Sequence, residues 1–381
     1  MYYLVSLLYG ASTSFIAPIY VVFLLNRGLD YKGVALIDSF FSVSIALLDY
    51  PTGGIADKYG RGRTTALACL FLGLGLLSYS FSRNLYQFLF SEFLAAVGAA
   101  LYSGAFTAWL VDSLKEENRD RDLSVVFGNA EVLSLIVSST GSLIGGLVAE
   151  YSLELPFALG SLLCFTAVPI ALILTRGRGE VYSKEERRYT DFLRSGIHVF
   201  LRNKPLILLT LATSLMALAR PSFTLTWAPY MECLGAEKWL LGLTGSLFMA
   251  IMGLGSYMGG RLAVKLGYRL TSCISVVFIS SSLLAILVAN NPYVFIISSL
   301  PLEAGLGLMI PTMDAWINRY IPSRERATVI SLRRTLIIPF RVLGTAAMGI
   351  LSDLESPRLA YIFAFAVNLL ALPLYIKVKD E

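Results

Sequence analysis

Long apolar runs alternate with short polar turns along most of the chain, from Tyr2 to Ile376. An apolar run of about twenty residues is long enough to cross the hydrocarbon core of a bilayer as a helix. Twelve such runs are present, and each predicts one membrane-spanning helix. They cover residues 2–25, 33–54, 64–82, 86–112, 124–149, 155–175, 205–231, 240–262, 270–290, 292–317, 328–351 and 357–376. The pattern therefore predicts an all-α multi-pass membrane protein with twelve transmembrane helices.

The second half of the chain repeats the first half. A constant shift aligns three segments in the same order: 53–60 with 260–267, Gly98 with Gly305, and 107–110 with 314–317. Ordered matches of this kind indicate two six-helix bundles related by a parallel repeat, with the substrate expected between them near the bilayer midplane. We expect the N-terminal bundle at 1–175 and the C-terminal bundle at 205–381.

The long polar stretch at 176–204 separates the two predicted bundles. Within it, apolar residues recur at helical spacing, at Tyr189, Phe192, Leu193, Ile197 and Phe200. This spacing favours an amphipathic helix that lies on the cytoplasmic headgroups, with its basic face toward anionic lipid. A solvated linker is the alternative. Membrane lipid is therefore one expected partner.

The composition excludes an ordinary soluble domain. The chain is 56% hydrophobic and 15% charged, with a mean hydropathy of +0.68, whereas soluble domains are about 25% charged. A single histidine, His198, and four cysteines without paired spacing predict no metal site and no cofactor. Neither a nucleotide-binding loop nor a nucleophile–base pair is present, so we expect no enzymatic activity.

Basic residues are distributed unevenly between the two sides of the predicted membrane. Most of the 31 Lys and Arg residues lie in the even-numbered turns and at the C-terminus. The odd-numbered turns hold only Arg27, Lys32, Arg83, Lys238 and Arg358. Cytoplasmic turns are enriched in Lys and Arg, so both termini are expected in the cytoplasm of a plasma-membrane protein. The net charge of +5 reflects this topology and does not indicate a nucleic-acid partner.

Two further patterns concern the ends and interruptions of the helices. Trp109 and Trp316 lie at matching cytoplasmic ends of the spans 86–112 and 292–317, where we expect interface anchors. Prolines predict helix interruptions in the first, seventh, tenth and eleventh spans, at Pro18, Pro221, Pro229, Pro311 and Pro339.

A charged turn follows the second apolar run. Its pattern G-x-x-x-D-K-x-G-R is formed by Gly53, Asp57, Lys58, Gly60 and Arg61. The pattern resembles the signature loop between helices 2 and 3 of the major facilitator superfamily of transporters. Gly62 replaces a residue that is usually basic there. The resemblance implies the major facilitator fold, transport by alternating access, and a monomer as the expected state.

The resemblance also implies a conformational latch. In the family, the aspartate of this loop docks onto helix 11 of the other half, so Asp57 is expected to reach Arg333 or Arg334. The positive N-terminal end of that helix would favour a carboxylate. The alternative is that these charges only set the topology.

Eight of the charged residues within the predicted spans are functional candidates, because a charge there costs at least about 2.5 kcal/mol on insertion scales. Four carboxylates are candidates for proton coupling: Asp38, Asp49, Glu92 and Glu131. Four residues of the second half are candidates for the substrate cavity: Arg220, Glu303, Asp314 and Arg341.

Glu92 stands where the family's helix 4 motif, R-x-x-x-G-x-G, has an arginine that is often tied to proton coupling. Proton coupling, a static pairing with a basic side chain, and substrate contact all remain open for Glu92. The run Gly141–Gly146 resembles the G-P-x-x-G-G motif of the drug/proton antiporter branch, with Ser142 in place of proline. Segments 105–109 and 321–329 are similar to prokaryotic drug- and metabolite-efflux members.

These features predict a secondary active transporter that exports small amphipathic or cationic molecules in exchange for protons. Uptake or exchange of a small organic or inorganic anion, bound by Arg220 and Arg341, is one alternative. A membrane scaffold or receptor that does not transport is the other. The expected partners are a small-molecule substrate, protons and lipid.

Overall fold

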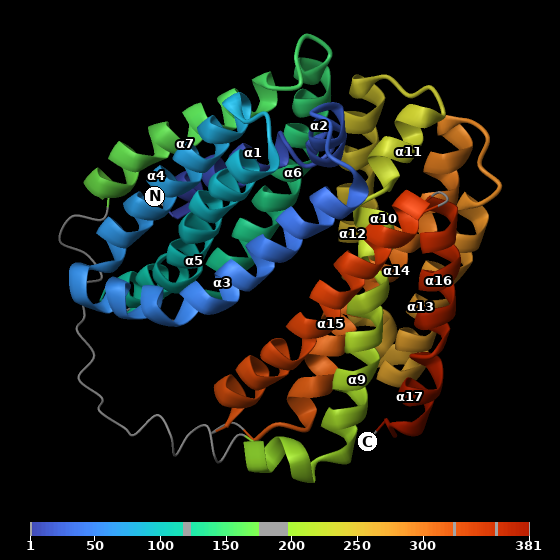
Figure 1. Cartoon of the computed structure of the whole chain (residues 1–381). Coiled ribbons are helices and arrows are strands. Elements are labelled where there is room, and N and C mark those ends of the chain that lie inside the picture. Colours follow the sequence, from blue (N-terminus) through green and yellow to red (C-terminus); the bar gives the residue numbers. More distant parts are fainter. Residues whose placement is uncertain (1, 117–122, 175–196, 323–324, 355–356, 381) are drawn as a thin grey trace. The chain divides into compact units, whose positions relative to one another are not determined.

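The computed structural model describes residues 2–116, 123–174, 197–322, 325–354 and 357–380. Every regular element in these residues is a helix, as Figure 1 shows. The chain forms two compact units. The first contains the helices up to α7 together with the beginning of α12, as far as Leu247, and the second contains the other helices.

The first unit contains seven helices of its own. They are α1 (Tyr2–Ser14), α2 (Tyr20–Asn26), α3 (Tyr31–Tyr59), α4 (Arg61–Phe81), α5 (Leu85–Glu116), α6 (Leu123–Ala149) and α7 (Leu155–Leu174). Helix α4 packs on both α5 and α7, and α1 packs on α6 and α7.

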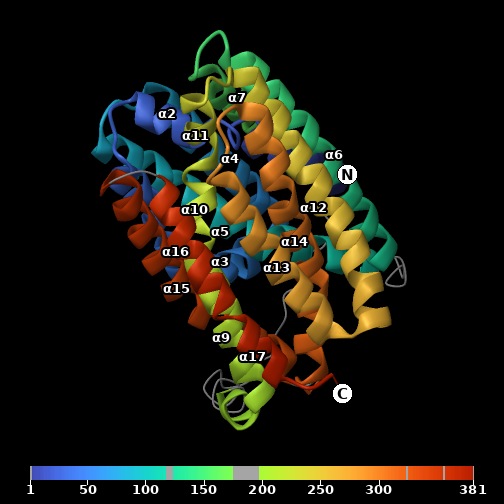
Figure 2. The ribbon, with the colours of Figure 1, turned by 90° about the vertical axis from the view of Figure 1, so that its right-hand side faces the viewer.

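The second unit contains the remaining helices, with α12 from Phe248 onward. They are α9 (Lys204–Ala219), α10 (Pro221–Thr224), α11 (Trp227–Cys233), α12 (Lys238–Leu266), α13 (Tyr268–Ile286), α14 (Pro292–Arg319), α15 (Arg326–Leu354), α16 (Pro357–Leu369) and α17 (Leu372–Lys377). Helix α13 packs on α14 and α16, and α9 packs on α15 and α16, which repeats the pairings of the first unit (Figure 2).

Among the described residues, eleven helical spans are long and apolar enough to cross a membrane. They correspond to all the predicted spans except the first, so the predicted fold class is confirmed. The first predicted span, 2–25, is two shorter helices with a turn at 15–19 that contains Pro18. Proline has no N–H to donate and clashes with the preceding turn, so it ends a helix readily.

The prolines differ in their effect on the helices. Pro18 and Pro221 lie at interruptions, because α9 ends at Ala219 and α10 begins at Pro221. Pro311 and Pro339, in contrast, lie inside α14 and α15, which continue through them. The predicted interruptions at these two residues are therefore wrong. Neighbouring helices in a membrane protein satisfy the backbone groups that such a proline leaves free.

The repeat is visible in the backbone at two pairs of glycines. Gly60 joins α3 to α4 with φ of 91°, and Gly267 joins α12 to α13 with φ of 85°. These angles favour glycine. A Cβ on Gly98 would lie 2.7 Å from the Leu72 nitrogen, and one on Gly305 would lie 2.7 Å from the Ser275 oxygen. Both pairs of helices therefore approach at the same place in the repeat.

The tryptophans of the repeat lie inside the two bundles. Trp109 is 5% exposed and packs with Phe106 in the core of the first unit. Trp316 is 1% exposed and stacks on Tyr375 in the core of the second. The prediction that they anchor the chain at the interface is wrong, because each ring fills space between helices.

The predicted amphipathic helix between the bundles falls mainly outside the described residues. Residues 197–202 are helical. Phe200 is buried against the core of the second unit, while Ile197 is exposed.

Candidate functional site

Glu92 lies inside the first unit and accepts a hydrogen bond from a tyrosine. The hydroxyl of Tyr79 on α4 donates to Glu92 Oε2 on α5. The Tyr79 oxygen also lies 3.1 Å from the Tyr20 hydroxyl of α2. Glu92 is 7% exposed and Tyr79 is 2% exposed. These three residues form a buried hydrogen-bonded chain, which we call the Glu92 site.

Aromatic rings surround the Glu92 site. The Tyr79 ring lies 5.7 Å from Phe88 and 5.4 Å from Phe157, and Phe23 packs against both phenylalanines. Such rings exclude water, so the carboxylate depends on the Tyr79 hydroxyl for its hydrogen bond. No cationic side chain pairs with Glu92 among the described residues. The static pairing of Glu92 with a basic side chain is therefore not the observed arrangement.

Asp38 belongs to the same neighbourhood. It lies on α3, is partly buried, and repels the Glu92 carboxylate electrostatically. Two like charges in a poorly solvated place repel strongly. A proton bound by either carboxylate removes this repulsion. The structure thus brings together two of the four proton-coupling candidates.

The other two proton-coupling candidates lie elsewhere in the first unit. Asp49 is exposed on α3 and accepts a hydrogen bond of 3.2 Å from Ser103 of α5. Glu131 is exposed on α6. Neither forms part of the Glu92 site as described above.

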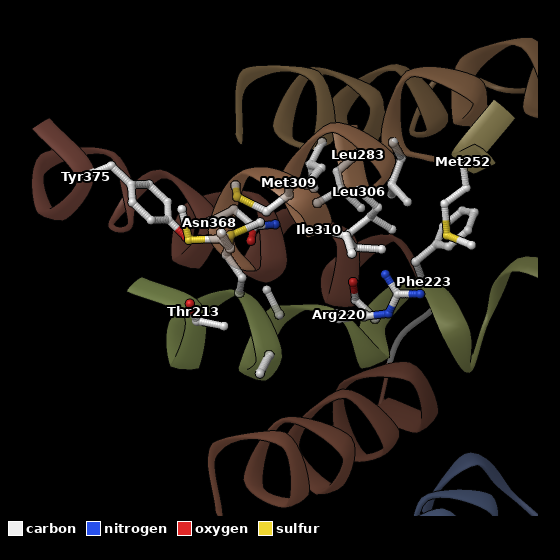
Figure 3. Close-up of a pocket in the computed structure, with 17 residues that line it drawn as sticks. Thr213, Arg220, Phe223, Met252, Leu283, Leu306, Met309, Ile310, Asn368 and Tyr375 are labelled. Carbon is white, nitrogen blue, oxygen red and sulfur yellow. Dashed lines mark hydrogen bonds between the residues drawn. The ribbon is translucent and has the colours of Figure 1, made fainter. Parts of the chain in front are cut away.

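A pocket of about 360 Å³ lies within the second unit (Figure 3). It is lined by α9, α10, α12, α13, α14, α16 and α17, and most of its lining residues are apolar. Its four methionines are Met216, Met252, Met309 and Met313. Methionine side chains adapt to apolar molecules of different shape. The pocket can therefore hold a small apolar or amphipathic molecule.

Arg220 is the charged residue of the pocket lining. It lies between α9 and α10, where Pro221 interrupts the helix, and it is exposed. Glu303 of α14 is 5% exposed and interacts electrostatically with Arg220. Glu303 itself does not line the pocket, so Arg220 is the one of the four cavity candidates that does. Asp314 and Arg341 are exposed and do not line it.

The predicted latch residues are only partly described. Only the helical backbone of Gly53 and Asp57 is described, so the pairing of the Asp57 side chain with α15 stays a prediction. Lys58 lies over the Tyr59 ring at 5.1 Å, and Gly60 and Arg61 are at the junction of α3 and α4.

On α15, Arg333 donates a 2.8 Å hydrogen bond to Thr213 of α9, and its Nε is buried without a partner among the described residues. The neighbouring Arg334 is exposed. In the structure, therefore, Arg333 is already joined to a helix of its own unit.

Comparison with known proteins gives the family. A profile described as Major Facilitator Superfamily matches residues 2–240 and 209–381, nearly the whole chain. The chain belongs to the Major Facilitator Superfamily. As a member of this superfamily it is a multi-pass membrane protein and a secondary transporter, and it is not an enzyme.

Relatives of this transporter include bacterial efflux pumps. It is 25% identical to the multi-drug resistance efflux pump PmrA of Streptococcus pneumoniae, over 97% of this chain and 95% of the pump. It is 29% identical to the quinolone resistance protein NorA of Staphylococcus aureus over 142 residues, or 37% of this chain and 36% of that protein. A solved structure of the nucleoside transporter NupG has a TM-score of 0.84 with 11% identity, covering 99% of this chain and 98% of that chain, which shows a common fold.

Sequence reasoning missed Tyr79 as the partner of Glu92. It also missed Asn368 and Ser222, which line the pocket of the second unit. Tyrosine, asparagine and serine carry no charge at neutral pH, so the rule that a charge within a membrane span is costly does not identify them. Only the packing of α4 on α5 brings Tyr79 to Glu92.

Proposed function

We propose that this transporter exports small amphipathic or cationic molecules in exchange for protons. The observation that carries the proposal is the Glu92 site, where a buried carboxylate has a neutral tyrosine as its hydrogen-bond partner. A carboxylate without a cation can gain or lose a proton without breaking an ion pair. Asp38 repels Glu92 when both are charged, so protonation of either carboxylate also removes this repulsion.

Protonation can drive transport by changing the relative stability of two conformations. A ligand or proton shifts such an equilibrium only by its difference in affinity for the two states. In the proposed mechanism Glu92 binds a proton from one side of the membrane and releases it to the other. The apolar pocket of the second unit and the names of the distant relatives, PmrA and NorA, support an amphipathic substrate.

The proposal includes three predictions from the sequence: the two bundles, the orientation of the chain in the membrane, and the latch at Asp57. Two bundles, at 1–175 and 205–381, would alternate in their access to the two sides, with both termini in the cytoplasm. Asp57 would hold one state by contact with Arg333 or Arg334. Replacement of Asp57 by asparagine should then slow transport without removing substrate binding.

The first experiment uses proteoliposomes that contain a pH-sensitive dye, with an imposed proton gradient and a panel of cationic, neutral and anionic amphipathic compounds. The wild type is compared with Glu92→Gln, which keeps the size of the side chain and removes its charge. The control is Glu325→Gln, which makes the same change immediately before α15, outside the predicted spans.

Proton flux that depends on cationic compounds, is lost in Glu92→Gln and persists in Glu325→Gln would support the proposal. Movement of anions without proton flux, unchanged by Glu92→Gln, would overturn it. The proposal would also be overturned if no compound in the panel were transported.

Anion exchange is the second candidate, because Arg220 lines the pocket and a guanidinium binds carboxylate or phosphate well. The two candidates respond differently to Arg220→Ala. Anion transport should disappear in this variant, whereas proton-coupled export of cations should persist.

A further inference from the structure

The pocket of the second unit has an exposed charged end and a buried neutral end. Figure 3 shows Arg220 at one end and Thr213, Asn368 and Tyr375 at the other. Thr213 and Arg220 are seven residues apart, which is about 10 Å along a helix at 1.5 Å per residue. Arg220 is exposed, so water hydrates its charge, whereas Asn368 is 3% exposed. The mainly apolar lining between the two ends suits a molecule with an apolar body.

Asn368 is the neutral group of the buried end that lacks a hydrogen bond. Its side-chain amide lines the pocket and makes no hydrogen bond to any residue that the structure describes. The other two neutral groups have partners. The Thr213 hydroxyl donates to a backbone carbonyl of α9 and accepts from Arg333, each at 2.8 Å, and the Tyr375 hydroxyl donates to the Met216 sulfur at 3.4 Å. Because buried polar groups nearly always have a hydrogen-bond partner, the Asn368 amide points to a ligand that supplies one.

The chemistry of an amide restricts this ligand. An asparagine side chain presents an acceptor and a donor side by side, whereas a carboxylate offers only acceptors and an ammonium group only donors. A primary carboxamide or a lactam presents both, and it pairs with asparagine through two hydrogen bonds. A charged group would also be costly in this buried place without a paired charge. Arg333 does not line the pocket, so a carboxylate at Asn368 would have no cation in contact with it.

We propose that this pocket binds neutral amphipathic amides, either primary carboxamides or lactams, whose amide group pairs with Asn368. The four methionines of the lining contact the apolar body. This inference rests on the proposed function in that it names a substrate class for the exporter. It concerns binding within the second unit and does not involve the Glu92 site.

A set of related compounds with one apolar body tests the proposal on the wild type. Biphenylcarboxamide has both a donor and an acceptor, its dimethylamide has only the acceptor, biphenylcarboxylate is an anion, and aminomethylbiphenyl is a cation. Binding of each to the full chain in lipid nanodiscs is measured by calorimetry at pH 7 without a proton gradient, and the heat of partition into nanodiscs without protein is subtracted. We expect biphenylcarboxamide to bind about tenfold or more tighter than the other compounds, which corresponds to about 1.4 kcal/mol.

Two variants locate the preference. Asn368→Leu keeps nearly the same size and removes both hydrogen-bonding groups, so the affinity for biphenylcarboxamide should fall about tenfold, to that of the dimethylamide. The matched control is Asn290→Leu, at an exposed asparagine that does not line the pocket, and it should keep the wild-type preference. Without ligand, Asn368→Leu should unfold at the same temperature as the wild type or higher, because it removes a buried polar group that has no hydrogen bond.

Three results would overturn the inference: equal binding of the carboxamide and the dimethylamide to the wild type, tightest binding of either charged compound, or a carboxamide preference that persists in Asn368→Leu. A lower unfolding temperature of Asn368→Leu would also overturn it, since the amide would then stabilise the fold itself.

The proton-flux experiment separates this inference from the proposed function. If the carboxamide preference is present and is lost in Asn368→Leu, while no compound drives proton flux in the wild type, the binding site stands and proton-coupled export fails. If proton flux depends on Glu92 but the carboxamide preference is absent, the proposed function stands and this inference fails.

Discussion

The two units each bury a glutamate on corresponding helices, but the two glutamates interact with different groups. Glu92 on α5 accepts a hydrogen bond from Tyr79 and lies among aromatic rings. Glu303 on α14 accepts no hydrogen bond among the described residues and faces the charge of Arg220 instead. The repeat aligns Glu92 with Ser299, so Glu303 lies one helical turn further along, about 6 Å.

The comparison shows that the two units share their close helix contacts but differ in the residues that surround the buried glutamate. The close helix contacts at Gly98 and Gly305 are the same. At the position that corresponds to Tyr79, however, the second unit has Ile286, and Ser299 and Ile286 are both fully buried. The hydrogen-bond donor and the carboxylate are thus both missing there. Each half thus has its own buried carboxylate, with a tyrosine hydroxyl as its partner in one half and the charge of Arg220 near it in the other.

The largest effects are expected where the shared framework is broken. In Gly98→Leu and in Gly305→Leu, the new side chain would meet the backbone of α4 or α13, because even a Cβ would lie 2.7 Å from a backbone atom. We expect each variant to lose about 3 kcal/mol or more, beyond the usual cost of overpacking. Thermal unfolding in detergent measures the loss. Gly128→Ala on α6, where nothing lies within 4 Å, is the control and should not destabilise the protein; an equally stable Gly98→Leu would show that the contact is not close.

The next prediction moves the glutamate to its corresponding position. Ser299→Glu would bury a carboxylate beside Ile286, without a hydrogen-bond donor from that residue, and should cost about 3–5 kcal/mol, as for other buried charges that lack a partner. The double variant with Ile286→Tyr restores the pair of the first unit and should recover part of this loss. Thermal unfolding at neutral pH distinguishes the two variants. No recovery in the double variant would contradict the close correspondence of the two helix pairs.

A smaller effect is expected from removing a single hydroxyl. Tyr79→Phe leaves the Glu92 carboxylate buried without its hydrogen bond, so the free energy of unfolding should fall by about 1–3 kcal/mol. The matched control in the second unit is Tyr375→Phe, whose hydroxyl bonds at 3.4 Å to the Met216 sulfur. This weak bond should be worth less than about 1 kcal/mol. A smaller loss for Tyr79→Phe than for Tyr375→Phe would show that Glu92 does not depend on Tyr79.

The smallest effect is expected at Glu154. This glutamate lies outside the membrane spans and serves as a partly exposed comparison for the two buried glutamates. The Ser152 hydroxyl, the backbone N–H of Glu154 and the Arg27 guanidinium hold the pKa of this carboxyl below its usual range, against the opposing effect of burial. A lowered folded pKa means that the stabilisation is present above the unfolded pKa of about 4.3 and is lost as the pH falls through the folded value.

The Glu154 side chain is 38% exposed, so we expect less than about 1 kcal/mol from its interactions. The difference in unfolding free energy between wild type and Glu154→Gln is measured from pH 3 to pH 7, a range that includes the titration of this carboxyl. The two proteins should converge in stability at the acid end. A wild type that is less stable than the variant at neutral pH would contradict the prediction.

Much of the fold could be predicted because its causes are local or periodic. Apolar runs of bilayer length locate the helices, and ordered matches such as Gly98 with Gly305 reveal the repeat. The ends of the helices were harder to predict. Pro18 and Pro221 interrupt helices, whereas Pro311 and Pro339 do not, because the neighbouring helices decide whether the freed backbone groups are satisfied.

The sequence by itself determined the membrane fold, the superfamily and the small set of costly charges in the spans, since apolar length and charge are properties of single segments. The tertiary structure decided which charges have partners. It placed Tyr79 and Asp38 near Glu92, and Arg220 near Glu303. It also buried Trp109 and Trp316, which were expected as anchors at the membrane interface. Such pairings join helices far apart along the chain, and they follow from packing that no local pattern specifies.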